Sequence, residues 1–167
     1  FYYLYSILST TALSFFNPIL YIYLLSKDFS FTEVGLYLSI FWLVSFMTEL
    51  PCGAITDNIG AKNSILLSVI FRVVGLILLL SNSLILLYIS AILSAIAESF
   101  QSGTLTSWLV NVNNKNNEEI DIDKVLSRSS LYSLFFSAVI GFVSAKYVYV
   151  YFKSLSIILS MSVFIIS

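Results

Sequence analysis

The sequence has no histidine, one cysteine and few charged residues, and each scarcity excludes a class of function. Lys, Arg, Asp and Glu make up 10% of the chain, against about 25% in ordinary soluble domains. The net charge of −1 provides no basic patch for a nucleic-acid partner. Without histidine the chain lacks the usual zinc ligand and acid–base catalyst, so we expect no metal site and no cofactor. The single cysteine, Cys52, has no internal partner for a disulfide.

Apolar residues, by contrast, are abundant. They make up 59% of the chain, and the mean hydropathy is +0.96, so the solvent that suits this sequence is a lipid bilayer. At about 20 apolar residues per span, the sequence predicts an all-α membrane protein with six transmembrane helices. The predicted helices cover residues 2–25, 33–54, 63–80, 84–110, 125–145 and 149–167.

The predicted helices divide into two groups. Residues 111–124 are rich in Asn and acidic residues and have almost nothing to bury, so we expect a solvated loop there. Residues 1–110 then hold four helices, and residues 125–167 hold two, the last of them truncated. The chain begins at Phe1 within an apolar run, without the Met or basic stretch of a signal peptide. We therefore interpret it as a fragment of a longer polypeptide.

Residues 53–62 form the most distinctive polar stretch of the chain. Gly53, Asp57, Gly60 and Lys62 follow the spacing G-x-x-x-D-x-x-G-x-K between the second and third apolar runs. Gly53 permits close approach of a neighbouring helix, and Gly60 can supply the left-handed backbone of a tight turn. The Asp57 carboxylate can accept hydrogen bonds from the free N–H groups of the helix that follows. We expect a polar hairpin here.

Polar groups within the spans mark further candidates, since each costs roughly a few kcal/mol in the bilayer unless it is paired or hydrated. Asn17, Glu49 and Gln101 are in the first, second and fourth spans. Arg72 is about 13 Å deep in the third span and Glu98 about 18 Å deep in the fourth, at a rise of about 1.5 Å per residue. At these comparable depths we expect an ion pair, which either serves the structure alone or couples protons or substrate to transport.

Three of the predicted helices carry a stripe of polar or small residues at helical spacing. In the first and fourth helices, a buried Asn and a Glu–Gln pair need water or specific partners, which favours lining of a cavity. For the fifth helix, close helix packing and cavity lining remain alternatives. The stripes are Ser6, Ser9, Thr10, Asn17 and Tyr21 in the first helix, Ser90, Ser94, Glu98, Gln101 and Ser102 in the fourth, and Ser130, Ser133, Ser137, Gly141 and Ser144 in the fifth.

The motifs resemble those of the major facilitator superfamily of secondary transporters. Residues 53–62 are similar to its signature loop between the second and third helices. Residues 49–53 read ELPCG, which is similar to the E-x-P-x-G sequence before that loop in bacterial drug-efflux members, including macrolide-type ones. Residues 99–109 read SFQSGTLTSWL, which resembles S-F-x-S-G-x-x-x-A-W-L in the fourth helix of the same group.

Three features depart from the family pattern. Asn58 and Ala61 stand where the family usually has basic residues, which leaves Asp57 and Lys62 for a charge relay. The fifth helix lacks the G-x-x-x-G-P-x-x-G-G run of many drug/proton antiporters.

The resemblance implies the N-terminal six-helix half of a twelve-helix fold, made of two three-helix repeats, with a missing C-terminal half as partner. It implies that residues 53–62 and 111–124 face the cytoplasm. It also implies that Asp57 bonds to the other half in the outward-facing state, supported by Gly53, Gly60 and Lys62.

The function implied is secondary active transport by alternating access, as proton-coupled efflux of a drug-like small molecule across a bacterial plasma membrane. Uptake of a sugar, a peptide or another metabolite is an alternative, as is a non-transporting membrane scaffold or receptor. The sequence does not favour an enzyme, because it has no intramembrane Asp pair, no His-rich motif and no G-x-S-x-G nucleophile.

Overall fold

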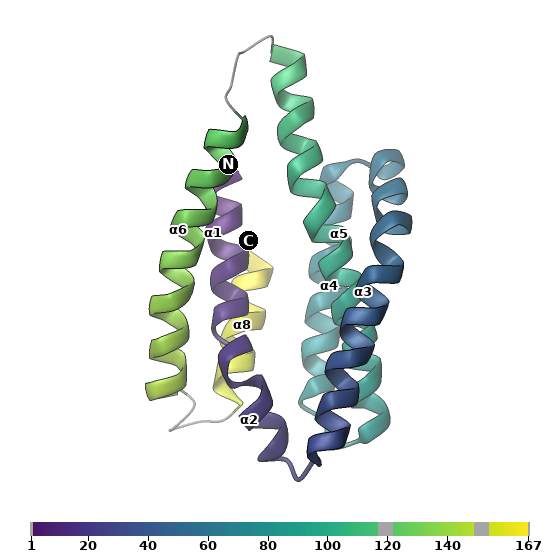
Figure 1. Ribbon diagram of the computed structural model, residues 1–167, viewed down its shortest axis with the longest axis vertical. Coiled ribbons are helices and arrows are strands. Elements are labelled where there is room, and N and C mark those ends of the chain that lie inside the picture. The colour runs from purple at the N-terminus through teal and green to yellow at the C-terminus, as the bar shows by residue number, and fades with distance from the viewer. Residues whose placement is uncertain (1, 117–121, 149–153, 167) are drawn as a thin grey trace. The chain divides into compact units, whose positions relative to one another are not determined.

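The computed structural model describes residues 2–116, 122–148 and 154–166, and the regular secondary structure of this part is helical (Figure 1). The helical elements are α1 (Tyr2–Ser14), the 3₁₀ turn η1 (Asn17–Ile19), α2 (Leu20–Leu25), α3 (Phe31–Ile59), α4 (Ala61–Leu79), α5 (Leu84–Asn116), α6 (Ile122–Val143), the π-helical turn η2 (Ser144–Val148) and α8 (Leu155–Ile166).

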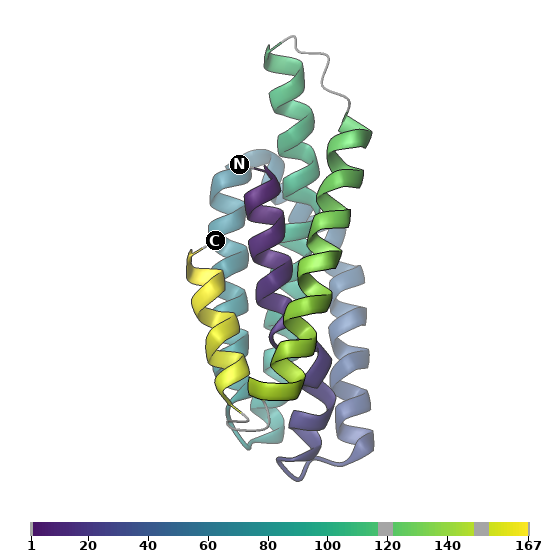
Figure 2. The ribbon, with the colours of Figure 1, turned by 90° about the vertical axis from the view of Figure 1, so that its left-hand side faces the viewer.

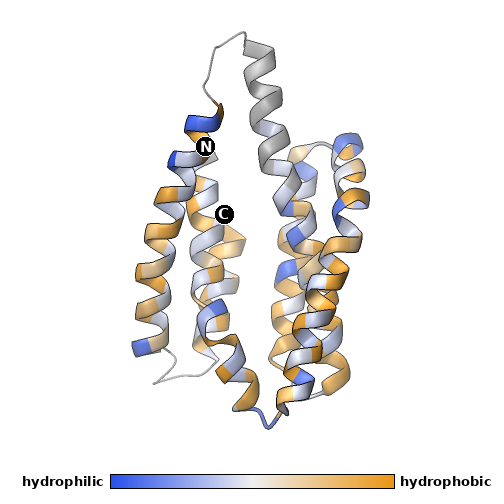
Figure 3. Ribbon diagram, in the orientation of Figure 1, coloured by the Kyte–Doolittle hydropathy of each residue, from blue (hydrophilic) through white to orange (hydrophobic). Residues whose placement is uncertain are grey.

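Five stretches of the described chain are long and apolar enough to cross a membrane, as predicted. Hydrophobic residues predominate along them, as Figure 3 shows. The sixth apolar helix, α8, has 12 described residues, fewer than the roughly 20 that a span needs. Residues 149–153, which the prediction assigns to the same helix, lie outside the described part. The five stretches are Tyr3–Leu25, Phe31–Ile59, Ala61–Leu79, Leu84–Ser102 and Ile122–Tyr147.

The helices form two compact units, each built around one central helix. One unit contains α1, η1, α2, α6, η2 and α8, and the other contains α3, α4 and α5. In the first unit α1 packs against both α6 and α8, and it lies between them in Figure 2. In the second unit α5 packs against both α3 and α4, which contact each other much less. Each unit therefore combines helices of both predicted three-helix repeats, because the first span packs with the fifth span and α8, and the second and third spans pack with the fourth.

Small hydroxyl side chains join α1 to α6. The hydroxyl oxygens of Ser6 and Ser133 lie 3.1 Å apart, and Ser14 donates to Ser137 over 2.7 Å. The predicted stripe on the fifth span therefore packs against the first span, which supports the packing alternative for it. The same bonds show that Ser6, in the stripe expected to line a cavity, serves helix packing within the first unit.

The first span is interrupted, although the sequence predicts one continuous helix over residues 2–25. Pro18 has no backbone N–H and cannot donate to the carbonyl four residues before it, so α1 ends at Ser14 and η1 follows. The hydroxyl of Ser144 donates to the carbonyl oxygen of Phe15 over 2.6 Å. This bond gives a hydrogen-bond donor to a backbone carbonyl at the interruption. A Cβ atom at Gly141 would lie 3.2 Å from Cγ of Pro18, so α6 approaches the interruption closely.

The predicted hairpin at residues 53–62 is almost entirely helical. A capping box of Ser30 and Glu33 begins α3, which continues to Ile59. Gly60 alone then separates α3 from α4, with a φ of 81° that a residue with a side chain rarely adopts. Residues 53–59 hold no glycine or proline after Gly53, so nothing in them ends the helix before Gly60.

The predicted loop at residues 111–124 is also shorter than expected. Helix α5 continues to Asn116 and α6 begins at Ile122, which leaves residues 117–121, outside the described part. The polar residues after Val110 include no proline or glycine, so they extend the helix although they have little to bury.

Lys27 anchors the start of the second unit to the end of α4. Its ammonium donates to the carbonyl oxygens of Leu79 (3.2 Å), Leu80 (2.5 Å) and Ser81 (3.0 Å). Such carbonyls have no intrahelical partners, and the helix dipole favours a cation there. Burial lowers the pKa of Lys27, whereas the three carbonyl acceptors favour its charged form.

Replacing Lys27 with Met is therefore expected to lower the free energy of unfolding by about 1–2 kcal/mol, because the three carbonyls lose their donor while the apolar stem is kept. Thermal unfolding in detergent measures the loss. Lys146→Met is the matched control, since Lys146 is exposed and rests over the rings of Phe142 and Tyr147. Equal losses in the two variants would contradict a capping role.

Candidate functional site

The expected ion pair is present inside the second unit. Arg72, in the middle of α4, donates through Nη2 to Oε2 of Glu98 on α5. The side chain of Arg72 is only 6% exposed, whereas that of Glu98 is 37% exposed. The guanidinium is therefore enclosed by protein, whereas part of the carboxylate is exposed.

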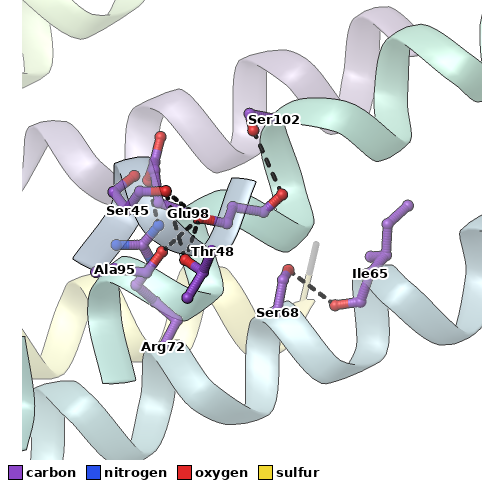
Figure 4. A network of polar contacts seen from close by, with 9 residues as sticks. Ser45, Thr48, Ile65, Ser68, Arg72, Ala95, Glu98 and Ser102 are labelled. Carbon is purple, nitrogen blue, oxygen red and sulfur yellow. Dashed lines mark hydrogen bonds and ion pairs between the residues drawn. The ribbon is translucent and has the colours of Figure 1, made fainter. Parts of the chain in front are cut away.

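A set of hydroxyl bonds holds α3 at the same level as this pair (Figure 4). The hydroxyl of Ser99, the residue after Glu98, lies 2.8 Å from Oγ1 of Thr48 and 3.1 Å from the carbonyl oxygen of Ser45. Figure 4 shows Ser45 and Thr48 beside the ion pair. We call Ser45, Thr48, Arg72, Glu98 and Ser99 together the polar cluster. It connects all three helices of the second unit at one depth.

Three residues of the polar cluster, Ser45, Thr48 and Ser99, were not among the site residues predicted from the sequence. Ser45 and Thr48 lie one turn apart within the second span, and Ser99 stands directly after a predicted intramembrane acid. Hydroxyl residues at helical spacing opposite a buried charge are the signal that could have identified them. Gln101, which lies one turn after Glu98, is partly buried.

The candidate gating residues lie at the junction of α3 and α4. Asp57 is exposed in the last turn of α3, not at the start of α4, and its carboxylate makes no hydrogen bond among the described residues. The expectation that it caps α4 is wrong, because α3 continues past it and Gly60 occupies the N-cap without a side-chain bond. Lys62 is exposed in the first turn of α4.

Gly53 also differs from expectation. No atom outside its own helix turn lies within 4 Å of a Cβ atom built on it. The helix that was expected to approach closely at this point is therefore absent from the described residues, and this side of α3 is open.

The remaining candidates are not brought together. Asn17 is exposed at the interruption of the first span and belongs to the first unit, whereas Gln101 belongs to the second. Glu49 is exposed on α3, next to Thr48 of the polar cluster, and makes no hydrogen bond or ion pair with the described residues. No group of three His, Cys, Asp or Glu side chains that could hold a metal ion occurs in the part of the chain that the structure describes.

These features define a class of protein. Five apolar stretches of membrane-spanning length and an ion pair that joins two of these helices are features of a multi-pass integral membrane protein. Its sequence matches the model of the Major Facilitator Superfamily over residues 2–167, and the chain belongs to this family of membrane transporters rather than to a family of enzymes.

A curated relative agrees with this assignment. The chain is 30% identical over 112 residues to the "Uncharacterized MFS-type transporter YxaM" of Bacillus subtilis (strain 168). The matched region is 66% of this chain but only 28% of that protein. No solved structure matches the chain.

Proposed function

We propose that the full-length polypeptide is a secondary active transporter that works by alternating access, and that it couples proton movement to the efflux of a drug-like small molecule. The family match over residues 2–167 is the observation that carries this proposal. Transporters of this kind hold their substrate near the bilayer midplane, between two halves that rock around it. The bacterial plasma membrane is the proposed location, in keeping with the Bacillus relative.

Glu98 is the residue that we propose for coupling. Its carboxylate lies within a membrane span and is partly exposed, while Arg72 beside it is enclosed. Protonation of Glu98 removes the negative charge that balances Arg72, so the two protonation states differ in their electrostatic cost inside the membrane. Such a difference is what coupling requires, because a proton shifts a conformational equilibrium only by its differential affinity for the two states.

Reconstitution of the full-length protein in proteoliposomes tests the transport function. We expect an imposed proton gradient to drive a hydrophobic dye such as ethidium toward the side that supplies protons, and collapse of the gradient to abolish the movement. If a sugar or a peptide moves in the same direction as the protons and the dye does not move, the result would favour uptake instead. Failure of every gradient to drive any solute would favour a scaffold or receptor.

Asp57 is proposed to stabilise the outward-facing state from its place at the end of α3, where it is exposed and ready for a partner outside these residues. Asp57→Asn is expected to slow transport about tenfold or more, because one charge-assisted hydrogen bond contributes about 1.5–3 kcal/mol to the preferred state. Asp28→Asn is the control, since Asp28 is an exposed loop residue whose φ of 65° an asparagine also tolerates. Equal rates for Asp57→Asn and the parent protein would contradict the gating role.

A further inference from the structure

The ion pair between Arg72 and Glu98 depends on how α5 is turned about its own axis. The side chain of Arg72 is only 6% exposed on α4, so it has little freedom to follow the carboxylate if α5 turns. At a radius of about 5–6 Å for helical side chains, a turn of about 20° moves the end of a side chain by about 2 Å. That displacement takes a donor and an acceptor out of hydrogen-bond range. Fixing the rotation of α5 near Glu98 therefore preserves the pair.

Ser99 is the residue after Glu98 on α5, and its hydroxyl bonds directly to α3. The hydroxyl oxygen lies 2.8 Å from Oγ1 of Thr48 and 3.1 Å from the carbonyl oxygen of Ser45. Ser99 itself is only 4% exposed, and Ser45 and Thr48 stand beside Glu98 in Figure 4. One buried side chain thus ties α5 to α3 at the level of the ion pair.

The hydroxyl bonds at Ser99 can be arranged in two ways, because each hydroxyl donates only one hydrogen. In the first arrangement, Thr48 donates to the carbonyl oxygen of Val44 in its own helix, over 2.8 Å, and Ser99 donates to Thr48. In the second, Thr48 donates to Ser99, and Ser99 donates to the carbonyl oxygen of Ser45. Both arrangements keep a bond between α3 and α5, and both need the hydroxyl of Ser99.

A second hydroxyl contact joins the same two helices away from the ion pair. Oγ1 of Thr56 and Oγ1 of Thr104 lie 3.4 Å apart, beyond the usual range of about 2.5–3.0 Å for bonds between hydroxyl groups. Thr104 also donates to the carbonyl oxygen of Phe100 in its own helix over 2.5 Å. This contact therefore constrains the rotation of α5 less than Ser99 does, and it provides a matched control.

We propose that Ser99 is a positioning residue, whose bonds to Thr48 and Ser45 fix the rotation of α5 and thereby keep the carboxylate of Glu98 on Arg72. The consequence for transport rests on the coupling role proposed above for Glu98. The positioning itself does not, because the ion pair exists whether or not the protein moves protons.

Carbodiimide labelling of the purified full-length protein tests the positioning without any transport. Dicyclohexylcarbodiimide is apolar and modifies protonated carboxyl groups, so a carboxylate that is paired with a guanidinium reacts slowly. Ser99→Ala is expected to raise the labelling rate of Glu98 about tenfold or more, which corresponds to the loss of one charge-assisted hydrogen bond. Mass spectrometry measures the rate, with labelling of Glu49, an exposed acid on α3, as the internal reference.

Two further variants follow from the bonding scheme. Thr48→Val is expected to raise the labelling rate of Glu98 less than Ser99→Ala does, because Ser99 can still donate to the carbonyl oxygen of Ser45. Thr104→Val is expected to leave the rate unaltered. An unchanged rate in Ser99→Ala, or equal increases in Ser99→Ala and Thr104→Val, would overturn the proposal, since the hydroxyl of Ser99 would then serve packing alone.

Transport by the same variants separates the positioning role of Ser99 from the coupling role of Glu98. In proteoliposomes, Ser99→Ala is expected to lower the number of protons moved per molecule of ethidium. If labelling of Glu98 rises while this ratio stays unchanged, the positioning role is supported and the coupling role of Glu98 is contradicted.

Discussion

Glu98→Gln is expected to lower the free energy of unfolding of the full-length protein by about 3 kcal/mol. The cost follows because Arg72 is only 6% exposed and would keep its charge without a counter-charge inside the membrane. Breaking a buried pair by removing one partner costs about 3–5 kcal/mol, and the lower end applies because Glu98 is partly exposed. Thermal unfolding in detergent measures the loss. Ser102→Ala, an exposed change one turn along α5, is the control.

A double variant separates the two interpretations of the pair. Replacing both Arg72 and Glu98 with Met removes both charges, and such replacements often recover the stability that a single change loses. We expect this variant to be folded but unable to couple a proton gradient to transport. If it retains transport with unchanged pH dependence, the ion pair serves only the structure. Glu98→Gln alone cannot decide, because its instability and a loss of coupling would both reduce transport.

The sequence was sufficient to predict the ion pair, and the reason is geometric. Arg72 and Glu98 lie on helices that are consecutive in the chain and joined by a short turn, so counting residues from the helix ends gives their relative depth. A charge inside a bilayer needs a partner, which leaves few choices. The structure brings the two side chains together as expected.

Contacts between distant parts of the chain were not predictable in the same way. The bond between Ser6 and Ser133 joins residues 127 positions apart, and a serine stripe looks the same whether it packs against a helix or lines a cavity. The interruption at Pro18 could have been anticipated, since proline within a helix removes a backbone bond. The continuous helix through residues 53–59 differs from the predicted hairpin, because polar residues do not end a helix when no proline or glycine interrupts them between Gly53 and Gly60.

Neighbouring positions on α3 have different surroundings. Helix α3 touches α5 through hydroxyl residues such as Thr48, while Glu49 is exposed beside it. One side of the helix therefore holds the second unit together, and another side is open at Glu49, Gly53 and Asp57.

Gly75 is the position where α4 and α5 approach most closely among the described glycines, and Gly75→Leu is expected to destabilise the protein by about 3 kcal/mol. A Cβ atom there would lie 2.6 Å from the hydroxyl of Ser94 and 3.3 Å from the carbonyl oxygen of Ser90. The hydroxyl can rotate away, but the backbone carbonyl cannot move without separating the helices.

Gly75→Ala should therefore cost less than Gly75→Leu, and Ser94→Ala should recover part of the loss in Gly75→Ala by removing the closest contact. Gly35→Ala on α3 is the matched control, since no atom lies within 4 Å of its Cβ position. That change should stabilise the protein by up to about 1 kcal/mol, because alanine is the better helix former. Unfolding in detergent measures all four variants. Similar effects at Gly75 and Gly35 would mean that the two helices do not pack at the distance described.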